Sequence, residues 1–319
     1  REQDAGEQPG LIYSRLNNPD LEILEGRLKL WDQADDCAVF ESGMSAITTV
    51  LMEFLRPGGV LLYSRPVYGG TAHFVEDILP QFGIHVLGYT PEMTTQEIES
   101  MLQESGHADR LKLIYVETPA NPTNTQIDIA AMRTLANAHQ QGEERPLVVV
   151  DNTYMGPIWQ HPLEHGADLI MYSATKYIGG HSDVIAGAVL GSTELMQRIK
   201  TLRTFLGNMA GPWTGWLLMR SLETLKIRMD KQAENAMQVA CFLQDQPKVK
   251  DVHYLGLLTE ADGRQYEIYK KQCSSPGAMV SIELHGGEAE AFAFLNNLKM
   301  VKLAVSLGST ESLAQHPAT

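Results

Sequence analysis

The chain has 319 residues, and its 25 Lys and Arg against 39 Asp and Glu give a formal net charge of −14. This length is enough for about two domains, and the 44% of hydrophobic residues can form a large core, which argues against intrinsic disorder. The acidic balance argues against nucleic acid or an anionic membrane as the main partner, and no apolar run reaches the roughly 20 residues of a membrane-spanning helix.

The first part of the chain is predicted to be an arm followed by a helix. Residues 1–19 are polar and lack periodicity, which predicts an extended arm. Apolar residues then recur at helical spacing from Leu21 to Trp31, and Asp20 is the expected cap of this helix. No charged and then apolar leader precedes it, so we expect no signal peptide. The start at Arg1 and the end without a closing helix or strand lead us to expect that both ends are trimmed.

Short apolar runs, with helical patterns between several of them, dominate the next part of the chain. The runs that we predict to be strands lie at 38–40, 60–63, 113–116, 147–150, 169–172 and 186–190. A glycine turn, Ser42-Gly43-Met44, opens one of the helices, and another helix is expected over 129–139. Continuous apolar strands that alternate with helices indicate an α/β fold with a mostly parallel sheet covered on both faces.

The pattern changes beyond about residue 206. A long helical stretch that contains Trp213 and Trp216 is predicted to end at Arg228. A helix near 231–245, strands at 252–254 and 279–284, and a helix at 289–298 are expected to follow, which is an α+β arrangement. We therefore expect three parts, an N-terminal arm at 1–19, a large domain at 20–227 and a smaller, truncated C-terminal α+β domain at 228–319.

Polar residues come directly after three of the predicted strands. They are the segments 117–122, 151–153 and 173–176. In open parallel sheets the ligand lies beyond the carboxyl ends of the strands, so these segments are expected to converge in one crevice.

Lys176 is an unusual residue at the end of a buried strand. Removing an ammonium group from water is unfavourable unless the group is paired or converted to a neutral form. An imine with an aldehyde cofactor converts it, and Ser173 and Thr175 could bind a phosphate beside it. A surface lysine at a strand end is the alternative, and the residue alone does not decide between the two.

Other polar residues near the predicted strand ends favour the cofactor interpretation. Asp151 could pair with a protonated pyridine nitrogen, although Asp is also a common helix cap. The turn at Gly43 could bind a phosphate at a helix start, or serve only as a tight turn. Tyr68 could stack on a cofactor ring, or be a half-buried aromatic residue in a loop. Each structural role is credible separately, but all of them together at neighbouring strand ends favour one site.

The chain resembles the Cys/Met-metabolism group of pyridoxal-phosphate (PLP) enzymes, which includes methionine γ-lyase, cystathionine γ-lyase and cystathionine γ-synthase. The matching segments, in order, are 13–15 with 18–19, 42–44, 68–71, 117–122, 151–153, 173–176, 180–183, and 306–308 with 311–313. The resemblance spans nearly the whole chain. It implies the PLP-dependent transferase fold of the aspartate aminotransferase type (fold type I), with pyridoxal 5'-phosphate as the cofactor.

The resemblance also implies roles for single residues. Lys176 would bind the cofactor covalently and move protons, Asp151 would bind the pyridine nitrogen, and Tyr68 would stack on the ring and act as acid or base toward the leaving group. The remaining cofactor contacts would come from Ser42, Gly43, Met44, Ser173 and Thr175 at the phosphate, Asn121 near the phenolic oxygen, and Tyr13 and Arg15 of a neighbouring subunit. These shared contacts imply a homodimer as the minimum unit and predict a homotetramer.

The substrate is expected to be a small sulfur amino acid. Ser306 would help to hold its carboxylate together with an arginine that we expect beyond the end of the chain, and Val305 and Tyr68 would lie beside its side chain. Because Ile12 and Val305 are both apolar, the resemblance favours γ-elimination on L-methionine, which yields methanethiol, 2-oxobutanoate and ammonia. Gly70 disagrees, since bacterial methionine γ-lyases usually have cysteine there. Cystathionine γ-lyase, cystathionine γ-synthase and O-acylhomoserine sulfhydrylase therefore remain alternatives.

A rival from another class is a metallopeptidase. Residues 161–165 match the HxxEH pattern of two zinc-binding histidines with a glutamate base. Pro162 indicates the start of a helix, and no third ligand is evident, so we expect a connecting turn and no metal. Three scattered cysteines, Cys37, Cys241 and Cys273, predict a reducing compartment, the cytoplasm, without disulfides.

Overall fold

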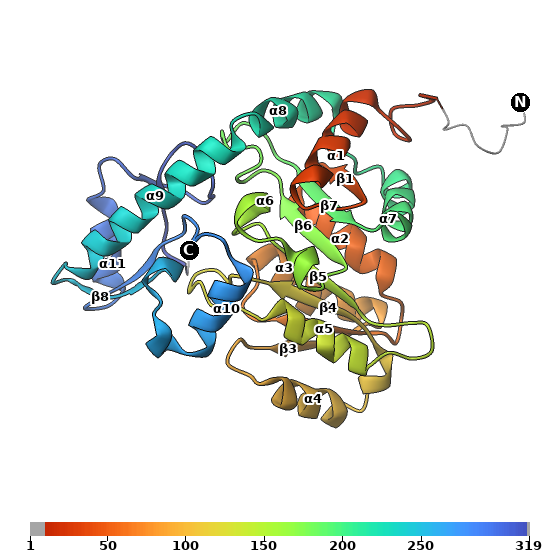
Figure 1. Ribbon diagram of the computed structural model, residues 1–319, viewed down its shortest axis with the longest axis horizontal. Coiled ribbons are helices and arrows are strands. Elements are labelled where there is room, and N and C mark those ends of the chain that lie inside the picture. The colour runs from red at the N-terminus through yellow and green to blue at the C-terminus, as the bar shows by residue number, and fades with distance from the viewer. Residues whose placement is uncertain (1–9, 318–319) are drawn as a thin grey trace, which may run out of the picture.

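The structure is a computed structural model that describes residues 10–317 (Figure 1). Its centre is a seven-stranded sheet in the order β1-β7-β6-β5-β4-β2-β3. The strands are β1 (Asp36–Phe40), β2 (Val60–Ser64), β3 (His85–Tyr89), β4 (Leu111–Glu117), β5 (Leu147–Asp151), β6 (Leu169–Ser173) and β7 (Gly187–Gly191). Neighbouring strands are parallel except at β7, which is antiparallel to both β1 and β6. The expected mostly parallel sheet is confirmed.

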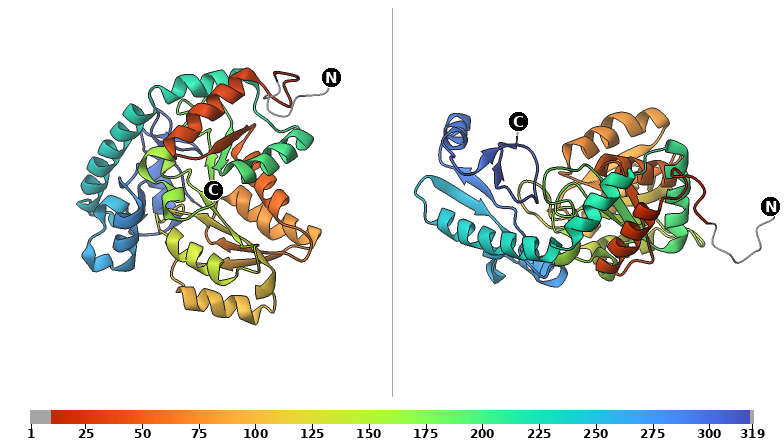
Figure 2. Two further views of the ribbon diagram at one scale, coloured as in Figure 1. Left: turned by 45° about the vertical axis from the view of Figure 1, so that its right-hand side comes forward. Right: turned by 90° about the horizontal axis from the view of Figure 1, so that it is seen from above.

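Helices cover both faces of this sheet (Figure 2). Those of the first two thirds of the chain are α1 (Pro19–Trp31), α2 (Gly43–Phe54), α3 (Gly69–His73), α4 (Thr95–Glu104), α5 (Ile129–Ala138), α6 (Gly156–Trp159), α7 (Thr193–Leu206) and α8 (Pro212–Leu222). In β5, Val149 packs in the core on the side of α2 and α7, whereas Val148 and Val150 pack on the side of α5. Burial of both faces explains why the strand reads as a continuous apolar run.

The C-terminal part is a smaller α+β arrangement, as expected. It comprises α9 (Leu225–Gln244), β8 (Val249–His253), α10 (Arg264–Gln272), β9 (Ser281–Leu284), α11 (Glu288–Asn296), β10 (Lys302–Leu303) and β11 (Leu313–Ala314). β8 pairs with β9 in antiparallel fashion, and β10 pairs with β11 in parallel. Among the described residues, no helix is both long enough and apolar enough to cross a membrane.

Two helix boundaries differ from the prediction. Asn18, not Asp20, caps α1, because the Asn18 side chain accepts the Asp20 N–H at 3.0 Å. The predicted helix end at Arg228 and the new start near 231 are also wrong. The chain breaks earlier, between Leu222 and Leu225, and α9 then continues without interruption through the expected domain border at 227/228.

The loop after β4 is bonded to the C-terminal part. The Asn124 amide donates to the backbone carbonyls of His253, at 3.0 Å, and Met279, at 2.9 Å. The Gln272 side chain accepts the Ile129 N–H at 2.7 Å. These bonds connect the end of the central sheet to the segments that follow α9.

Candidate active site

The beginning of α2 lies against the end of β6. Ser42 caps this helix by accepting the Ser45 N–H at 3.0 Å. A Cβ atom at Gly43 would lie 3.0 Å from the Cβ of Ser173, and one at Gly187 would lie 2.2 Å from the Ser42 carbonyl oxygen. Glycine at these positions therefore allows three backbone segments to meet. Because the first N–H groups of a helix have no intrahelical partner, they form a place for an anion here.

Two buried carboxyl groups lie side by side at the ends of β4 and β5. Glu117 and Asp151 are paired in register. Asp151 accepts the Tyr115 hydroxyl at 3.1 Å and the Thr153 N–H at 3.0 Å. Burial raises the pKa of Asp151 above its usual range, and burial together with the Asp151 charge raises the pKa of Glu117 to about 8.

Tyr68 is held beside these carboxyl groups by its backbone. Its N–H donates to Glu117 Oε2 at 2.7 Å. A Cβ atom at Gly70 would lie 2.8 Å from the Tyr68 ring and 3.0 Å from the Met44 sulfur. The loop after β2 therefore meets the start of α2 at a point where there is no room for a side chain. Tyr68 as a whole residue is 55% exposed, which leaves it open to a ligand.

Lys176 lies in a tight turn after β6. Its backbone N–H donates to the Ser173 carbonyl at 3.1 Å, and its Nζ donates to Ser306 Oγ at 3.2 Å. Burial lowers the pKa of the Lys176 amine. A lower pKa leaves more of the amine neutral, which is the form that reacts with an aldehyde.

These contacts bring most of the predicted residues together. Gly43 packs against Ser173, and Met44 and Tyr68 both lie beside Gly70. Tyr68 bonds to Glu117, which is the strand neighbour of Asp151. Lys176 bonds to Ser306. The Ser173 N–H also donates to Thr153 Oγ1 at 2.8 Å, and the Thr153 N–H donates to Asp151, so Thr153 links Ser173 to Asp151.

The arrangement fits PLP. Within residues 10–317, Asp151 forms no ion pair with Lys, Arg or His, although its carboxyl group is buried and receives only neutral donors. A buried carboxylate of this kind lacks a cationic partner, which a protonated pyridine supplies. The anion site at α2 and the desolvated amine of Lys176 match the phosphate and the aldehyde of the same molecule.

Other predicted residues lie apart from this centre or are already engaged. Thr175 Oγ1 exchanges two hydrogen bonds with the Ala186 backbone, at 3.0 and 3.2 Å. Asn121 is half-buried in the loop after β4. Tyr13 and Arg15 are exposed next to α7, where Arg15 donates to the Thr204 carbonyl at 2.8 Å. Val305 and Ile12 are also exposed. Residues 1–9 of the predicted arm lie outside the described part of the chain.

The HxxEH segment forms a short 3₁₀ turn at Pro162–His165, which agrees with the predicted connection. The Nδ1 atom of His161 lies 3.4 Å from the Oδ1 atom of Asp32. In the described residues, the group of three potential metal ligands within 4.8 Å of one another is Asp251, His253 and Glu283 on β8 and β9, which does not include the HxxEH histidines.

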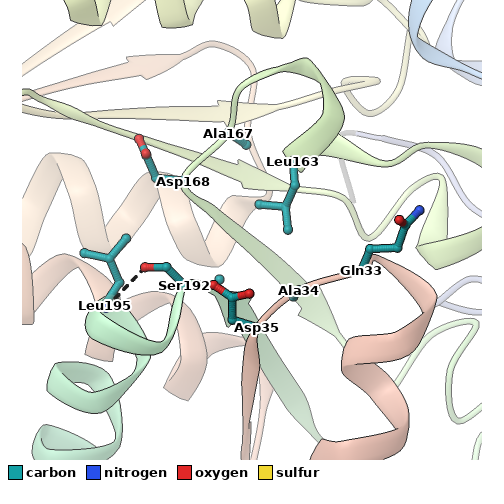
Figure 3. Close-up of a pocket in the computed structure, with 9 residues that line it drawn as sticks. Gln33, Ala34, Asp35, Leu163, Ala167, Asp168, Ser192 and Leu195 are labelled. Atoms are coloured by element: carbon teal, nitrogen blue, oxygen red, sulfur yellow. Dashed lines mark hydrogen bonds between the residues drawn. The ribbon is translucent and has the colours of Figure 1, made fainter.

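A cavity of about 220 Å³ lies at the other end of the strands, away from the residues described so far (Figure 3). Asp35 and Asp168, which line it, directly precede β1 and β6, so the cavity lies at the amino ends of these strands. Asp168 already pairs with Arg133 and Arg145. The cavity is therefore separate from the site at the carboxyl ends.

Sequence reasoning did not assign roles to Glu117, Tyr115 and Thr153. Glu117 was visible as a charged residue directly after an apolar run, which is a signal of the same kind as Asp151. Tyr115 lies inside the run and reads as a core residue, so only the register of β4 against β5 reveals its bond to Asp151.

Comparisons with known proteins agree with this geometry. The profile of the Cys/Met metabolism PLP-dependent enzymes matches residues 1–319. The chain is 41% identical over 317 residues to an L-methionine γ-lyase of Pseudomonas putida, covering 99% of this chain and 76% of that protein. It is 37% identical over 319 residues to a cystathionine γ-lyase of Rattus norvegicus, covering 100% of this chain and 77% of that protein.

A solved structure is similar as well. It is a cystathionine γ-synthase of Xanthomonas oryzae pv. oryzae in complex with aminoacrylate and cysteine. It matches with a TM-score of 0.90 and 33% identity, over 99% of this chain and 78% of that one. The fold, the PLP-compatible centre and the sequence identity lead to the same conclusion: the chain belongs to the family of Cys/Met metabolism PLP-dependent enzymes.

Proposed function

We propose that the protein is a PLP-dependent carbon–sulfur lyase that converts L-methionine and water to methanethiol, 2-oxobutanoate and ammonia. The observation that carries this proposal is the placement of the Lys176 amine, desolvated and 3.2 Å from Ser306 Oγ, at the sheet edge that also holds Asp151 and Tyr68. An amine, a carboxylate and a phenol with these environments supply the proton transfers of a γ-elimination.

When bound, PLP delocalises the negative charge that develops at the substrate Cα. Asp151 would hold the pyridine nitrogen in its protonated form, and the hydrogen bonds from Tyr115 and Thr153 fix the direction of its carboxyl group. The first-turn N–H groups of α2, together with Ser42, Gly43, Met44 and Ser173, would hold the phosphate, and Asn121 would lie near the phenolic oxygen. Thr175, whose hydroxyl bonds to the Ala186 backbone, would lie beside the phosphate and support the turn.

Lys176 binds the cofactor and then moves protons at the substrate. Its lowered pKa favours the neutral amine, the form in which Nζ can take the proton from Cα. Ser306 Oγ orients that nitrogen and, with its hydroxyl, contacts the substrate carboxylate. The Tyr68 hydroxyl gives a proton to the departing sulfur. After passing on the first proton, Nζ takes a second one from Cβ, and that electron pair forms the Cβ–Cγ double bond as the C–S bond at Cγ breaks. Hydrolysis of the remaining four-carbon unit releases ammonia and the 2-oxo acid.

L-Methionine is favoured because the predicted substrate neighbours are apolar. Val305 precedes Ser306 directly, and Ile12 precedes Tyr13. Neither side chain can pair with the second amino-acid group of cystathionine, whereas both can contact a methyl thioether. The 41% identity to a methionine γ-lyase supports the same choice.

Gly70 favours a second candidate, a cystathionine γ-lyase or a γ-replacement enzyme that uses an activated homoserine. A Cβ atom here would lie 2.8 Å from the Tyr68 ring, so the cysteine that is usual in bacterial methionine γ-lyases would require Tyr68 to move. Glycine leaves Tyr68 in its present position. The relatives also include a cystathionine γ-lyase.

Product analysis distinguishes these candidates. The PLP-loaded protein is incubated separately with L-methionine, L-cystathionine and an O-acylhomoserine plus a thiol. We expect methanethiol and 2-oxobutanoate from L-methionine, little turnover of L-cystathionine, and loss of activity in Lys176→Ala. Rapid γ-replacement without cleavage of methionine would overturn the lyase proposal. Retention of a covalent cofactor adduct in Lys176→Ala would overturn the role of the lysine.

We further propose a homodimer with shared sites, assembled into a tetramer, in which the arm at 1–19 reaches the neighbouring subunit. Its support is that Tyr13 and Arg15 are exposed and that Arg15 bonds to the Thr204 carbonyl of α7. The proposed large domain spans 20–227 and the proposed C-terminal domain spans 228–319, and helix α9 crosses the border between them. Three free cysteines support a cytoplasmic location.

A further inference from the structure

The segment 306–310 closes over the turn that carries Lys176. Gly308 has a φ of +76°, and a Cβ atom there would lie 2.6 Å from the Tyr177 nitrogen and 3.0 Å from the Lys176 carbonyl carbon. The Thr310 N–H donates to the Gly180 carbonyl at 3.1 Å. Backbone packing and one hydrogen bond therefore place Ser306 beside Lys176.

Helix α9 contacts both of these segments with side chains one turn apart. Arg228 donates to the Tyr177 carbonyl at 2.9 Å, below the lysine turn. Gln232 donates to the Ser309 carbonyl at 2.8 Å and to the Gly308 carbonyl at 3.4 Å. Residues four apart share one face of a helix, so a single rigid element fixes the two segments relative to each other.

Only the NH₂ group of the Gln232 amide forms hydrogen bonds within residues 10–317. Its Oε1 atom is buried and has no hydrogen-bond partner among residues 10–317. A buried acceptor without a partner is destabilising, and the two hydrogen bonds that the same amide donates offset this cost. The donor half faces two carbonyl oxygens, which can accept but not donate, and this fixes the orientation of the amide.

We propose that Gln232 is a positioning residue for Ser306. By binding the carbonyls two and three residues later, it holds the Ser306 hydroxyl at the distance from Lys176 Nζ that substrate binding requires. This inference rests on the proposed function, in which Ser306 contacts the substrate carboxylate. Gln232 touches neither the cofactor centre nor the substrate, and it acts through the 306–310 segment.

The test compares Gln232→Met, which keeps the size of the side chain but removes the N–H donor, with Gln238→Met. Gln238 is an exposed residue of the same helix. Binding of L-norleucine, which has no leaving group at Cγ, is measured by calorimetry on the PLP-loaded proteins. PLP affinity is measured by titration of the cofactor-free proteins, and KM and kcat are measured with L-methionine.

We expect Gln232→Met to weaken L-norleucine binding and to raise KM by between about 2- and 10-fold, the range that one hydrogen bond provides. PLP affinity should stay within about twofold of the wild type, because the phosphate and ring contacts are unchanged. Gln232→His, which retains an N–H donor, should recover part of the loss. Gln232→Asn, one methylene shorter, provides a second variant should the methionine variant fail to fold, and should weaken binding in the same way.

Equal L-norleucine binding by Gln232→Met, Gln232→Asn and Gln238→Met overturns the inference, as does a parallel loss of PLP affinity, which indicates a general structural defect. A wild-type protein that takes up no PLP and binds no L-norleucine overturns the proposed function, and the inference with it. A wild-type protein that binds both, combined with an unaffected Gln232→Met, overturns the inference alone.

Discussion

Burial has opposite effects on two ionisable residues of the site. It lowers the pKa of the Lys176 amine and raises the pKa of the Glu117 carboxyl group, because in both cases the charged form is the one that loses hydration. Each shift links folding to pH in a direction that can be measured on the cofactor-free protein.

For Lys176, the unfolded chain binds the proton more tightly than the folded protein between the lowered pKa and the ordinary value of 10.5. Stability contributed by this residue therefore rises with pH across that window. We expect cofactor-free Lys176→Met to be more stable than wild type at pH 7, with a smaller difference at pH 10. Urea denaturation at both pH values measures this. The exposed Lys226→Met is the control, and a pH-independent difference would contradict the assignment.

For Glu117, the folded protein binds the proton more tightly, since its pKa is about 8 against an ordinary 4.5. Stability from the protonated carboxyl group is present below pH 4.5 and is lost as the pH rises through 8. Cofactor-free Glu117→Gln should therefore gain stability relative to wild type between pH 5 and pH 9. Denaturation curves across this range, with the exposed Glu144→Gln as control, measure it. Parallel curves for the variant and wild type would count against the shift.

At the level of the elements, the N-terminus of α2 is capped by Ser42 and is the proposed binding place of the phosphate. Ser42→Ala should lower the free energy of unfolding by about 1 kcal/mol, the usual value of a lost N-cap, and should also weaken PLP binding. Ser192 caps α7 in the same way, through the Leu195 N–H, away from the site. Ser192→Ala should lower stability similarly and leave the PLP titration unchanged. Equal PLP affinity in the two variants would contradict the proposal that α2 binds the phosphate.

Elements with strong periodic patterns could be predicted from the sequence, and those held by tertiary contacts could not. The apolar runs that form β4, β5 and β6 are buried on both faces and are recognisable for that reason. β3 was missed, because it lies at the sheet edge and its side chains are mostly half-exposed. The break between α8 and α9 was misplaced, since neither Gly nor Pro marks it.

The same distinction applies to the site. Lys176, Asp151 and Tyr68 follow apolar runs, so a rule about strand ends finds them. Gln232 lies on a helix face that reads as solvated, and its partners at Gly308 and Ser309 are about 76 residues away in sequence. These residues meet only in the folded chain, and no local sequence pattern predicts such a contact.

At the scale of the whole molecule, the loop after β4 connects the central sheet to the C-terminal part through Asn124. This residue has a φ of +59°, which Asn tolerates better than most side chains, and it donates two hydrogen bonds. Asn124→Ala should lower the free energy of unfolding by about 2 kcal/mol, because two acceptors lose their donor. Thermal and urea denaturation measure this, with the exposed Asn137→Ala as control. A loss as small as that of the control would contradict the role of this loop.

The proposed dimer makes a prediction about the surface near the arm. Phe205 and Trp213 are 78% and 69% exposed, and their helices α7 and α8 flank α1 in Figure 1. Exposed aromatic side chains such as these are enriched at subunit interfaces. We expect Phe205→Lys to shift the protein toward monomer in sedimentation and to weaken PLP binding, since the partner's arm is lost. Phe242→Lys on α9 is the matched control. A monomeric variant with wild-type PLP affinity would contradict shared sites.

The closure of segment 306–310 over Lys176 has a consequence for biosynthesis. Ser306 lies 130 residues after the lysine. The ribosome therefore adds Lys176 to the chain long before it adds segment 306–310, which covers the amine. Until then this cover is missing, and the amine is more open to water than in the folded chain. The covering of the Lys176 amine is thereby deferred until the residues around Ser306 have been added.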